Sequence, residues 1–306
     1  MTTAADPDRQ APLDAFRADR RYLGADHARN ERRTWIVAGI CIVTLTAQIA
    51  GGLIFDSVAL TVNGLHMAAH VVALLVAAVA YRLARTYAAD PRFAFGTGKL
   101  GYLAGFANAA VLAVSALMIV GESVERLMDP HEVSYQGALV LAAGALALNL
   151  ACAWLLRPAA VHAHDKDGDL NLSAAHLHLT ADAAVSALAI AGLAAGRWLG
   201  WTWADPAAGV VGAALVAHFA WGLLRRSGAV LLDMNPSPAL TEEVRARLQQ
   251  DGERVIDLHL WRLGPGHHAA IVVVSSPAPL APEAYRARLK GLAGLSHVTV
   301  EVRASA

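Results

Sequence analysis

Six long apolar segments, each about the length needed to cross a bilayer, constrain this fold more than any other feature of the sequence. They cover residues 35–55, 58–80, 100–121, 135–156, 172–195 and 203–224. Short polar turns and loops separate them, and only 16% of the chain is charged while 56% is hydrophobic. A helix satisfies its own backbone hydrogen bonds inside a bilayer, so we expect an all-α domain of six transmembrane helices.

Polar residues inside the second and fifth segments break this apolar pattern. His66 and His70 are four residues apart in the second segment, and His178 and Asp182 repeat the spacing in the fifth. Residues four apart lie on one face of a helix, one turn above each other. Ionisable side chains at membrane depth are costly and usually face a cavity or one another. Two such faces packed together predict one divalent-metal site, with the ligands His66, His70, His178 and Asp182.

Three imidazoles and one carboxylate suit tetrahedral zinc, and imidazole also suits cobalt and nickel. These ligands bind metal only when deprotonated, so protons compete with the metal, which is a physical basis for metal–proton exchange. The alternative is a set of packing residues that hydrogen-bond to their neighbours. The segment limits place His66 and His70 nearer the outer face than His178 and Asp182. Either the two helices are offset or tilted, or these limits are wrong. His176 is a possible substitute for one of the two ligands in the fifth segment.

Basic residues are unevenly distributed between the two sides of the predicted bundle. With both termini inside, the outer turns keep only Arg126 and Arg197, and all other basic residues up to Arg226 lie on the inner side. This asymmetry predicts a multi-pass protein of the cell inner membrane with both termini cytoplasmic. Residues 1–14 hold no apolar run, so we expect no cleavable signal peptide. The formal net charge is zero, which gives no support for a nucleic-acid partner.

Three regions follow from this pattern: a cytoplasmic tail (1–33), the transmembrane domain (34–230) and a small cytoplasmic domain (237–306). In the last region the pattern predicts two helices, at 240–250 and 282–292, and three strands, at 255–263, 269–275 and 298–303. Their order along the chain is helix, strand, strand, helix and strand. This order indicates an α+β domain of the ferredoxin-like sort. A domain this small gains from pairing, so we expect a homodimer. Cys41 and Cys152 lie in apolar segments, and we interpret them as packing residues rather than a disulfide or thiolate ligands.

The chain resembles the cation diffusion facilitator (cation efflux) family, in its cobalt, nickel and zinc efflux branch. The resemblance rests on the paired motifs and on the stretches Asn30-Glu31-Arg32-Arg33-Thr34-Trp35, Leu65-His66-Met67-Ala68-Ala69-His70 and Asp257-Leu258-His259-Leu260-Trp261. It implies a homodimeric metal/proton antiporter that expels divalent cations from the cytoplasm. It implies no enzyme activity and no cofactor, because the metal is cargo, and it makes His66, His70, His178 and Asp182 the transport ligands.

Departures from the family pattern bear on metal choice and on further sites. His70 stands where many members have Asp, and Asn63 where they have an acidic residue, so manganese should bind less well than cobalt, nickel or zinc. A second site in some members lies in the loop between the second and third spans. Here that loop retains only Asp90, and we expect the site to be absent.

Other metal-capable side chains leave alternatives open. The small domain offers Asp257, His259, His267, His268, His297 and Glu301. We weigh a regulatory metal site there equally with surface or turn roles for His267 and His268. The loop 162–169 is a reduced histidine-rich loop, which we interpret as a solvated linker rather than a metal-gathering site. Rival functions are a histidine-ligated membrane metalloenzyme and a membrane metal sensor.

Overall fold

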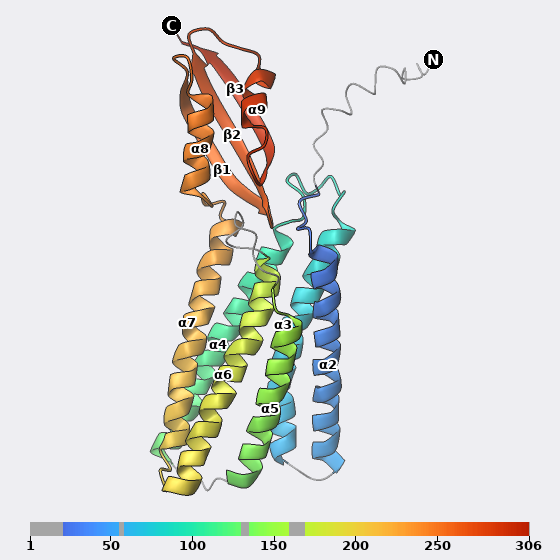
Figure 1. Cartoon of the computed structure of the whole chain (residues 1–306). Coiled ribbons are helices and arrows are strands. Elements are labelled where there is room, and N and C mark those ends of the chain that lie inside the picture. Colours follow the sequence, from blue (N-terminus) through green and yellow to red (C-terminus); the bar gives the residue numbers. More distant parts are fainter. Residues whose placement is uncertain (1–20, 55–57, 130–134, 159–168, 306) are drawn as a thin grey trace, which may run out of the picture.

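The computed structural model describes residues 21–54, 58–129, 135–158 and 169–305, without the side chains of residue 52 and residues 58–66. Figure 1 shows a bundle of long helices side by side, with a small domain stacked on one end. The first described residues lie at that same end of the bundle (Figure 1). The loop predicted at 162–169 falls outside the described residues except for Asp169.

Six helices of the described chain are long and apolar enough to cross a membrane, which confirms the predicted spans. They are α2 (His27–Ile54), α3 (Val58–Thr86), α4 (Leu100–Met128), α5 (Tyr135–Leu155), α6 (Leu170–Leu199) and α7 (Ala204–Leu231). Most extend beyond the predicted limits, and α2 begins inside the predicted tail (1–33). Hydropathy marks only the apolar part of a helix, whereas backbone hydrogen bonding continues into its polar flanks.

Side-chain and backbone caps set the ends of α6. The Asp169 carboxylate accepts hydrogen bonds from the backbone N–H groups of Asn171 and Leu172, at 3.1 and 3.2 Å. These bonds satisfy amides that have no partner within the first turn of the helix. At the other end Gly200 adopts a left-handed φ of 72°, a conformation that favours glycine, and closes the helix.

The helices pack chiefly as the pairs α2–α3, α4–α7, α5–α6 and α6–α7. Small residues allow close approach at several crossings. A Cβ at Gly192 of α6 would lie 2.7 Å from the Asp205 Cα of α7. A Cβ at Gly105 of α4 would lie 3.4 Å from the Leu170 carbonyl oxygen of α6. At these crossings the backbones are in close contact. This is expected in a membrane, where lipid is as apolar as the side chains and helix association depends on close van der Waals packing.

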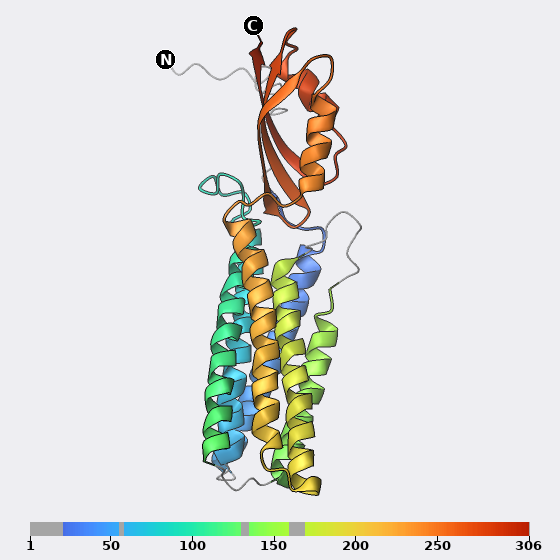
Figure 2. The ribbon, with the colours of Figure 1, turned by 90° about the vertical axis from the view of Figure 1, so that its left-hand side faces the viewer.

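The small domain has the predicted order of helix, strand, strand, helix and strand. Its elements are α8 (Pro238–Leu248), β1 (Arg254–Gly264), β2 (His267–Ser276), α9 (Pro282–Leu289) and β3 (Leu295–Ala304). The sheet order is β1-β2-β3, with β1 antiparallel and β3 parallel to β2. Figure 2 shows both helices on one side of the sheet. Val244 and Leu248 of α8 and Tyr285 and Leu289 of α9 form its core with the buried valines of the sheet.

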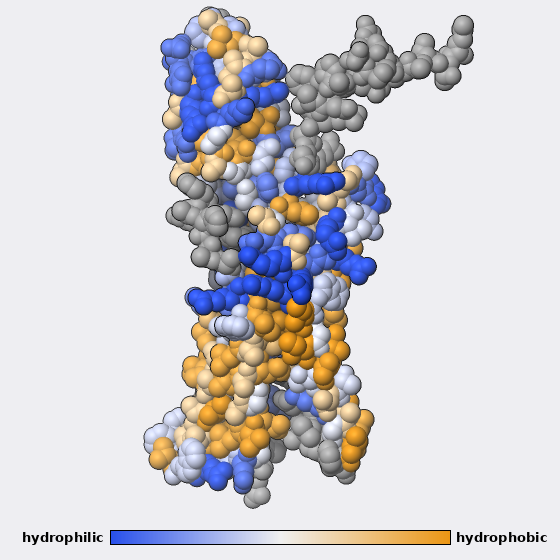
Figure 3. All heavy atoms as spheres, turned by 45° about the vertical axis from the view of Figure 1, so that its right-hand side comes forward, coloured by the Kyte–Doolittle hydropathy of each residue, from blue (hydrophilic) through white to orange (hydrophobic). Residues whose placement is uncertain are grey.

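The small domain contacts the bundle through a junction of three segments: 22–24, 95–99 and 261–265. Tyr22 is buried against Trp261, Leu263 and Ala269. A Cβ at Gly98 would lie 2.4 Å from the Leu263 carbonyl oxygen and 2.6 Å from that of Tyr22. On the face in Figure 3, hydrophilic residues form a belt at this end of the bundle, and hydrophobic residues cover the helices below it.

Candidate metal site

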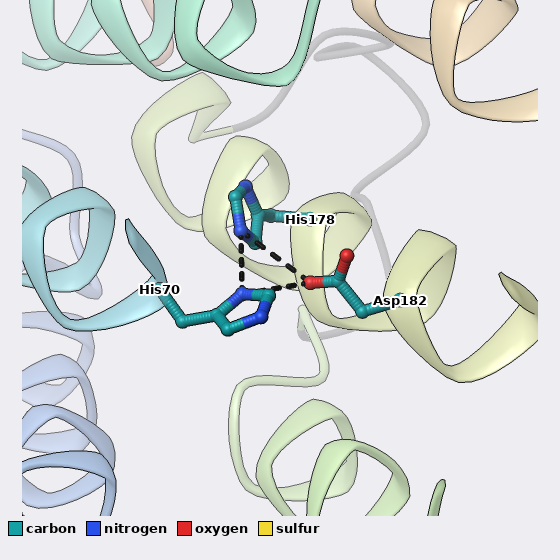
Figure 4. Close-up of side chains that lie close together, drawn as sticks. All are labelled: His70, His178 and Asp182. Atoms are coloured by element: carbon teal, nitrogen blue, oxygen red, sulfur yellow. Dashed lines mark hydrogen bonds and ion pairs between the residues drawn. The ribbon is translucent and has the colours of Figure 1, made fainter. Parts of the chain in front are cut away.

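Three of the four predicted ligands meet inside the bundle (Figure 4). His70 Nδ1 lies 2.9 Å from His178 Nε2 and 3.0 Å from Asp182 Oδ2. His178 Nε2 lies 3.4 Å from the same carboxylate oxygen. His70 and His178 are buried, and the Asp182 side chain is 17% exposed. Among the described residues, this is the one group of three or more metal-capable side chains whose ligand atoms lie within 4.8 Å of one another.

The helices α3 and α6 bring these side chains together. His178 and Asp182 share one face of α6 because they are one helical turn apart. Leu74 of α3 and Leu179 of α6 belong to the same buried cluster. The Asn171 side-chain amide donates to the Ala77 carbonyl oxygen at 2.9 Å, which fixes the axial position of α6 against α3.

The spacing of the three ligand atoms fits a dication. Two nitrogen or oxygen ligands about 2.1 Å from a tetrahedral zinc ion lie roughly 3.4 Å apart. The observed separations of 2.9 to 3.4 Å are those of hydrogen-bonded ligands that need small outward shifts to admit an ion. One carboxylate and two imidazoles also leave a positive charge on the bound complex, so the site suits a cation that must be released.

His66, the fourth predicted ligand, has its side chain outside the described residues, and its backbone lies in α3. It is one turn before His70 on the same helix face. The depth mismatch expected from the segment limits does not separate the other three. The helices are offset along their axes, because Asn171 in the first turn of α6 lies beside Ala77, which is nine residues before the end of α3 at Thr86.

His176 does not join this group. Its Nδ1 lies 3.0 Å from the Ala153 carbonyl oxygen of α5. A residue two positions before His178 lies on a different face of α6, so the suggested substitute ligand is directed towards α5.

The other metal-capable side chains make separate contacts in the described structure. Asp257 and His259 lie 2.9 Å apart, and His267 contacts Ser296. The Glu301 carboxylate accepts a hydrogen bond from Arg303 at 2.7 Å. Together these contacts form no larger metal-capable group among the described residues. The structure therefore gives no support for the suggested regulatory site in the small domain.

Asp90, the remaining acidic residue of the loop between α3 and α4, has a basic partner. Arg92 lies 2.7 Å away through its Nη2. Hydrogen bonds from the Arg92 side chain and backbone hold the pKa of Asp90 below its usual value. The prediction that this loop has no second metal site stays a prediction, and the ion pair agrees with it.

Two features of the bundle were not predicted from the sequence. Asp169 binds Asn30 of α2 at 2.9 Å and the Tyr81 hydroxyl of α3, which ties the start of α6 to both helices. Cys41 and Cys152 belong to one apolar cluster, which was not predicted. Both are buried, which agrees with the prediction that they are packing residues. No sequence signal relates these partners, since they are far apart along the chain and come together only through helix packing.

Six helices that can cross a membrane, with a buried cluster of two imidazoles and a carboxylate between them, define the class of this chain as a multi-pass membrane protein. Residues 34–232 match the family model for the cation efflux transmembrane domain. The chain therefore belongs to the cation efflux family, which confirms the resemblance. It is a transporter and not an enzyme, and the metal is a transported substrate rather than a cofactor.

Curated relatives match over most of this chain. A protein named zinc transporter ZitB from Yersinia pestis is 30% identical over 284 residues, covering 89% of this chain and 88% of the relative. The "cadmium, cobalt and zinc/H(+)-K(+) antiporter" of Bacillus velezensis is 28% identical, over 92% of this chain and 91% of its own length. The cation efflux system protein CzcD of an Alcaligenes species is 30% identical, over 91% and 90%.

Proposed function

We propose that this protein exports a divalent transition-metal cation from the cytoplasm in exchange for protons. His70, His178 and Asp182 are the ligands in this proposal, and His66 completes the set. The observation that carries it is the convergence of the three described side chains at 2.9 to 3.4 Å inside the bundle. Ionisable groups at this depth are costly, and transport of a cation is a reason to retain them.

Proton exchange follows from the chemistry of these ligands. The imidazole nitrogens and the carboxylate oxygen of the cluster contact one another, and each of these atoms can hold either a proton or a metal ion. A metal can bind only when those protons leave. Alternating access requires two states whose metal affinities differ, with protons taking the ligands in the outward-facing state. One relative is named as an antiporter, which supports this mode.

Zinc, cobalt and nickel are the substrates that this ligand set favours. Imidazole nitrogens bind all three, whereas manganese prefers carboxylates. Two relatives carry zinc in their names, and one of these names also includes cadmium and cobalt. Cadmium is therefore added to the candidates, and nickel rests on ligand chemistry alone.

We place the protein in the inner membrane as a homodimer with both termini in the cytoplasm. The small domain and the first described residues lie at the same end of the bundle, which supports a common side for the two termini (Figure 1). The excess of basic residues on that side orients it towards the cytoplasm. Dimer formation rests on the family resemblance and on the small size of the C-terminal domain.

Transport by reconstituted protein tests the ligand assignment. The variants His70→Ala and Asp182→Ala should lower zinc flux into proteoliposomes under a proton gradient to the level of empty vesicles. His176→Ala is the matched control, because this histidine lies on α6 and binds a backbone carbonyl instead of the site. Its flux should stay near that of wild type. Full transport by both site variants would reject the assignment.

A further inference from the structure

A cavity of about 150 Å³ lies between α4, α6 and α7, at the end of the bundle opposite the small domain (Figure 1). Its lining includes side chains from all three helices: Glu122, Ser123 and Arg126 of α4, Val185 and Ala189 of α6, and Asp205 of α7. A volume of this size has room for several water molecules or for a partly hydrated cation.

The helix face that carries the predicted ligands on α6 continues into this cavity. Val185 is seven residues after His178, and Ala189 is seven residues after Asp182. Residues seven apart lie on one face of a helix, so the ligands and the lining residues share a single stripe of α6. Val185 follows Asp182 by less than one turn. The cavity therefore begins just beyond the metal site, on the predicted outer side.

Arg126 binds two carboxylates at the cavity. Its Nη2 lies 2.5 Å from Glu122 Oε1, one turn earlier on α4, and its Nη1 lies 3.5 Å from Asp205 Oδ2. The Asp205 side chain is 16% exposed, whereas the Arg126 side chain is 48% exposed and can move into solvent. When both carboxylates are ionised, the single guanidinium leaves one negative charge uncompensated. The cavity therefore favours cations.

Ser123 presents a hydroxyl to the same cavity. The residue is 5% exposed, and it hydrogen-bonds to no other residue in the described parts of the chain. A Cβ at Gly209 of α7 would overlap Ser123 Oγ, so the glycine leaves space for this hydroxyl between the helices. A buried hydroxyl without a hydrogen bond is costly, so Ser123 Oγ requires a polar partner within the cavity.

The ligand chemistry of the cavity differs from that of the triad. Apart from Arg126, the polar side chains that line it present oxygen. Carboxylate and hydroxyl oxygens suit hard cations such as Mn²⁺, whereas imidazole suits zinc, cobalt and nickel. An oxygen-only set of this kind holds a transition-metal dication weakly, which is the property expected of a site from which a cation leaves.

We propose that Glu122, Asp205 and Ser123 form an outer cation site, and that the Arg126 guanidinium occupies this site as a tethered cation. A divalent cation binds there when Arg126 moves out into solvent. Arg126 thus competes with metal ions, lowers the affinity of the outer site and opposes rebinding of an exported ion. The place of this site on an export path rests on the proposed function, but cation binding at the site does not.

Mn²⁺ binding tests the site, because free Mn²⁺ has a sharp paramagnetic resonance spectrum that weakens when the ion binds a protein. Mn²⁺ alone is titrated into the purified full-length chain carrying Asp182→Ala, which removes the carboxylate of the triad. Adding Arg126→Gln should raise the affinity of one Mn²⁺ site per chain by about tenfold or more, because a competing positive charge is lost. Adding Asp205→Asn as well should abolish this gain.

Arg197→Gln is the matched control, because Arg197 is the other arginine of the outer turns and its guanidinium lies over Trp198 instead of in the cavity. It should leave Mn²⁺ affinity at the level of the Asp182→Ala chain. Equal Mn²⁺ binding by the Arg126→Gln and Arg197→Gln chains would overturn the outer site. A gain that survives Asp205→Asn would overturn it as well.

Glu122→Gln provides a test that does not depend on folding of the Arg126→Gln chain, since the Glu122 side chain is 64% exposed. In the Asp182→Ala background it should weaken Mn²⁺ binding, and unchanged binding would overturn the site. The titration requires no transport, because Asp182→Ala already removes a proposed transport ligand. Failure of the outer site would therefore leave the assignment of the triad unchanged.

Discussion

Asp169 connects three helices through one carboxylate. It caps its own helix by accepting two backbone hydrogen bonds, and it accepts further bonds from Asn30 of α2 and Tyr81 of α3. His178 and Asp182 follow on the same helix, so the position of the cap sets where they lie relative to His70. Asp169 is thus a positioning residue for the site rather than a ligand.

Asp169→Ala should destabilise the bundle and weaken metal binding together. Loss of the cap costs about 1 kcal/mol, and each buried partner left without its bond adds about 1–3 kcal/mol. Thermal unfolding in detergent and zinc titration measure the two effects. Ser237→Ala is the matched control, because Ser237 caps α8 outside the bundle. It should leave zinc affinity unchanged. Wild-type affinity in Asp169→Ala would contradict the positioning role.

At the scale of the helices, close packing depends on a few glycines. Gly192 brings α6 against α7, where its absent Cβ would lie 2.8 Å from the Ala204 carbonyl oxygen as well as against Asp205. Backbone atoms cannot move aside by changing rotamer, so this crossing tolerates no added methyl group without a helix shift. Gly144 of α5 has no such neighbour, because a Cβ there would meet no atom within 4 Å.

The pair Gly192→Ala and Gly144→Ala therefore separates packing from helix propensity. Both changes favour the helix intrinsically, by up to about 1 kcal/mol. Overpacking at Gly192 should outweigh this gain and cost about 1–3 kcal/mol. We expect a lower unfolding temperature for Gly192→Ala and an equal or higher one for Gly144→Ala. Equal unfolding temperatures for the two variants would contradict the crossing described here.

Hydropathy and spacing predict the elements but not their partners. The apolar segments identify six helices, and the four-residue spacing places His178 and Asp182 on one face of α6. The meeting of Cys41 with Cys152, and of Asp169 with Tyr81, depends on how each helix rotates and slides against its neighbours. A hydrophobic pattern fixes that geometry weakly in a membrane, because lipid-facing and core-facing positions are both apolar. The predicted limits of the segments are also too short, because hydropathy marks only the apolar part of each helix and the helix continues into its polar flanks.

At the scale of the whole molecule, the small domain is held to the bundle at the end of the loop that leads into α4. Gly98 contacts Tyr22 and Leu263, and Lys99 pairs with Asp233 just beyond α7. Thr97 donates to the Ala84 carbonyl oxygen of α3 at 2.6 Å. The start of α4 therefore lies within a few residues both of β1 and of the segment just beyond α7.

Gly98→Ala should open this junction without unfolding either domain. The new Cβ would lie 2.4 Å from the Leu263 carbonyl oxygen and 2.8 Å from the Gly264 Cα, so β1 must move away. Hydrogen exchange of the amides at 261–268 should then accelerate, by about tenfold for each 1.4 kcal/mol of protection lost. Gly121→Ala is the matched control on α4, because its Cβ would meet no atom within 4 Å. Exchange at 261–268 that is the same in both variants would show that the domain is held elsewhere. Faster exchange in Gly98→Ala alone would identify the junction as the mechanical link between the small domain and the bundle.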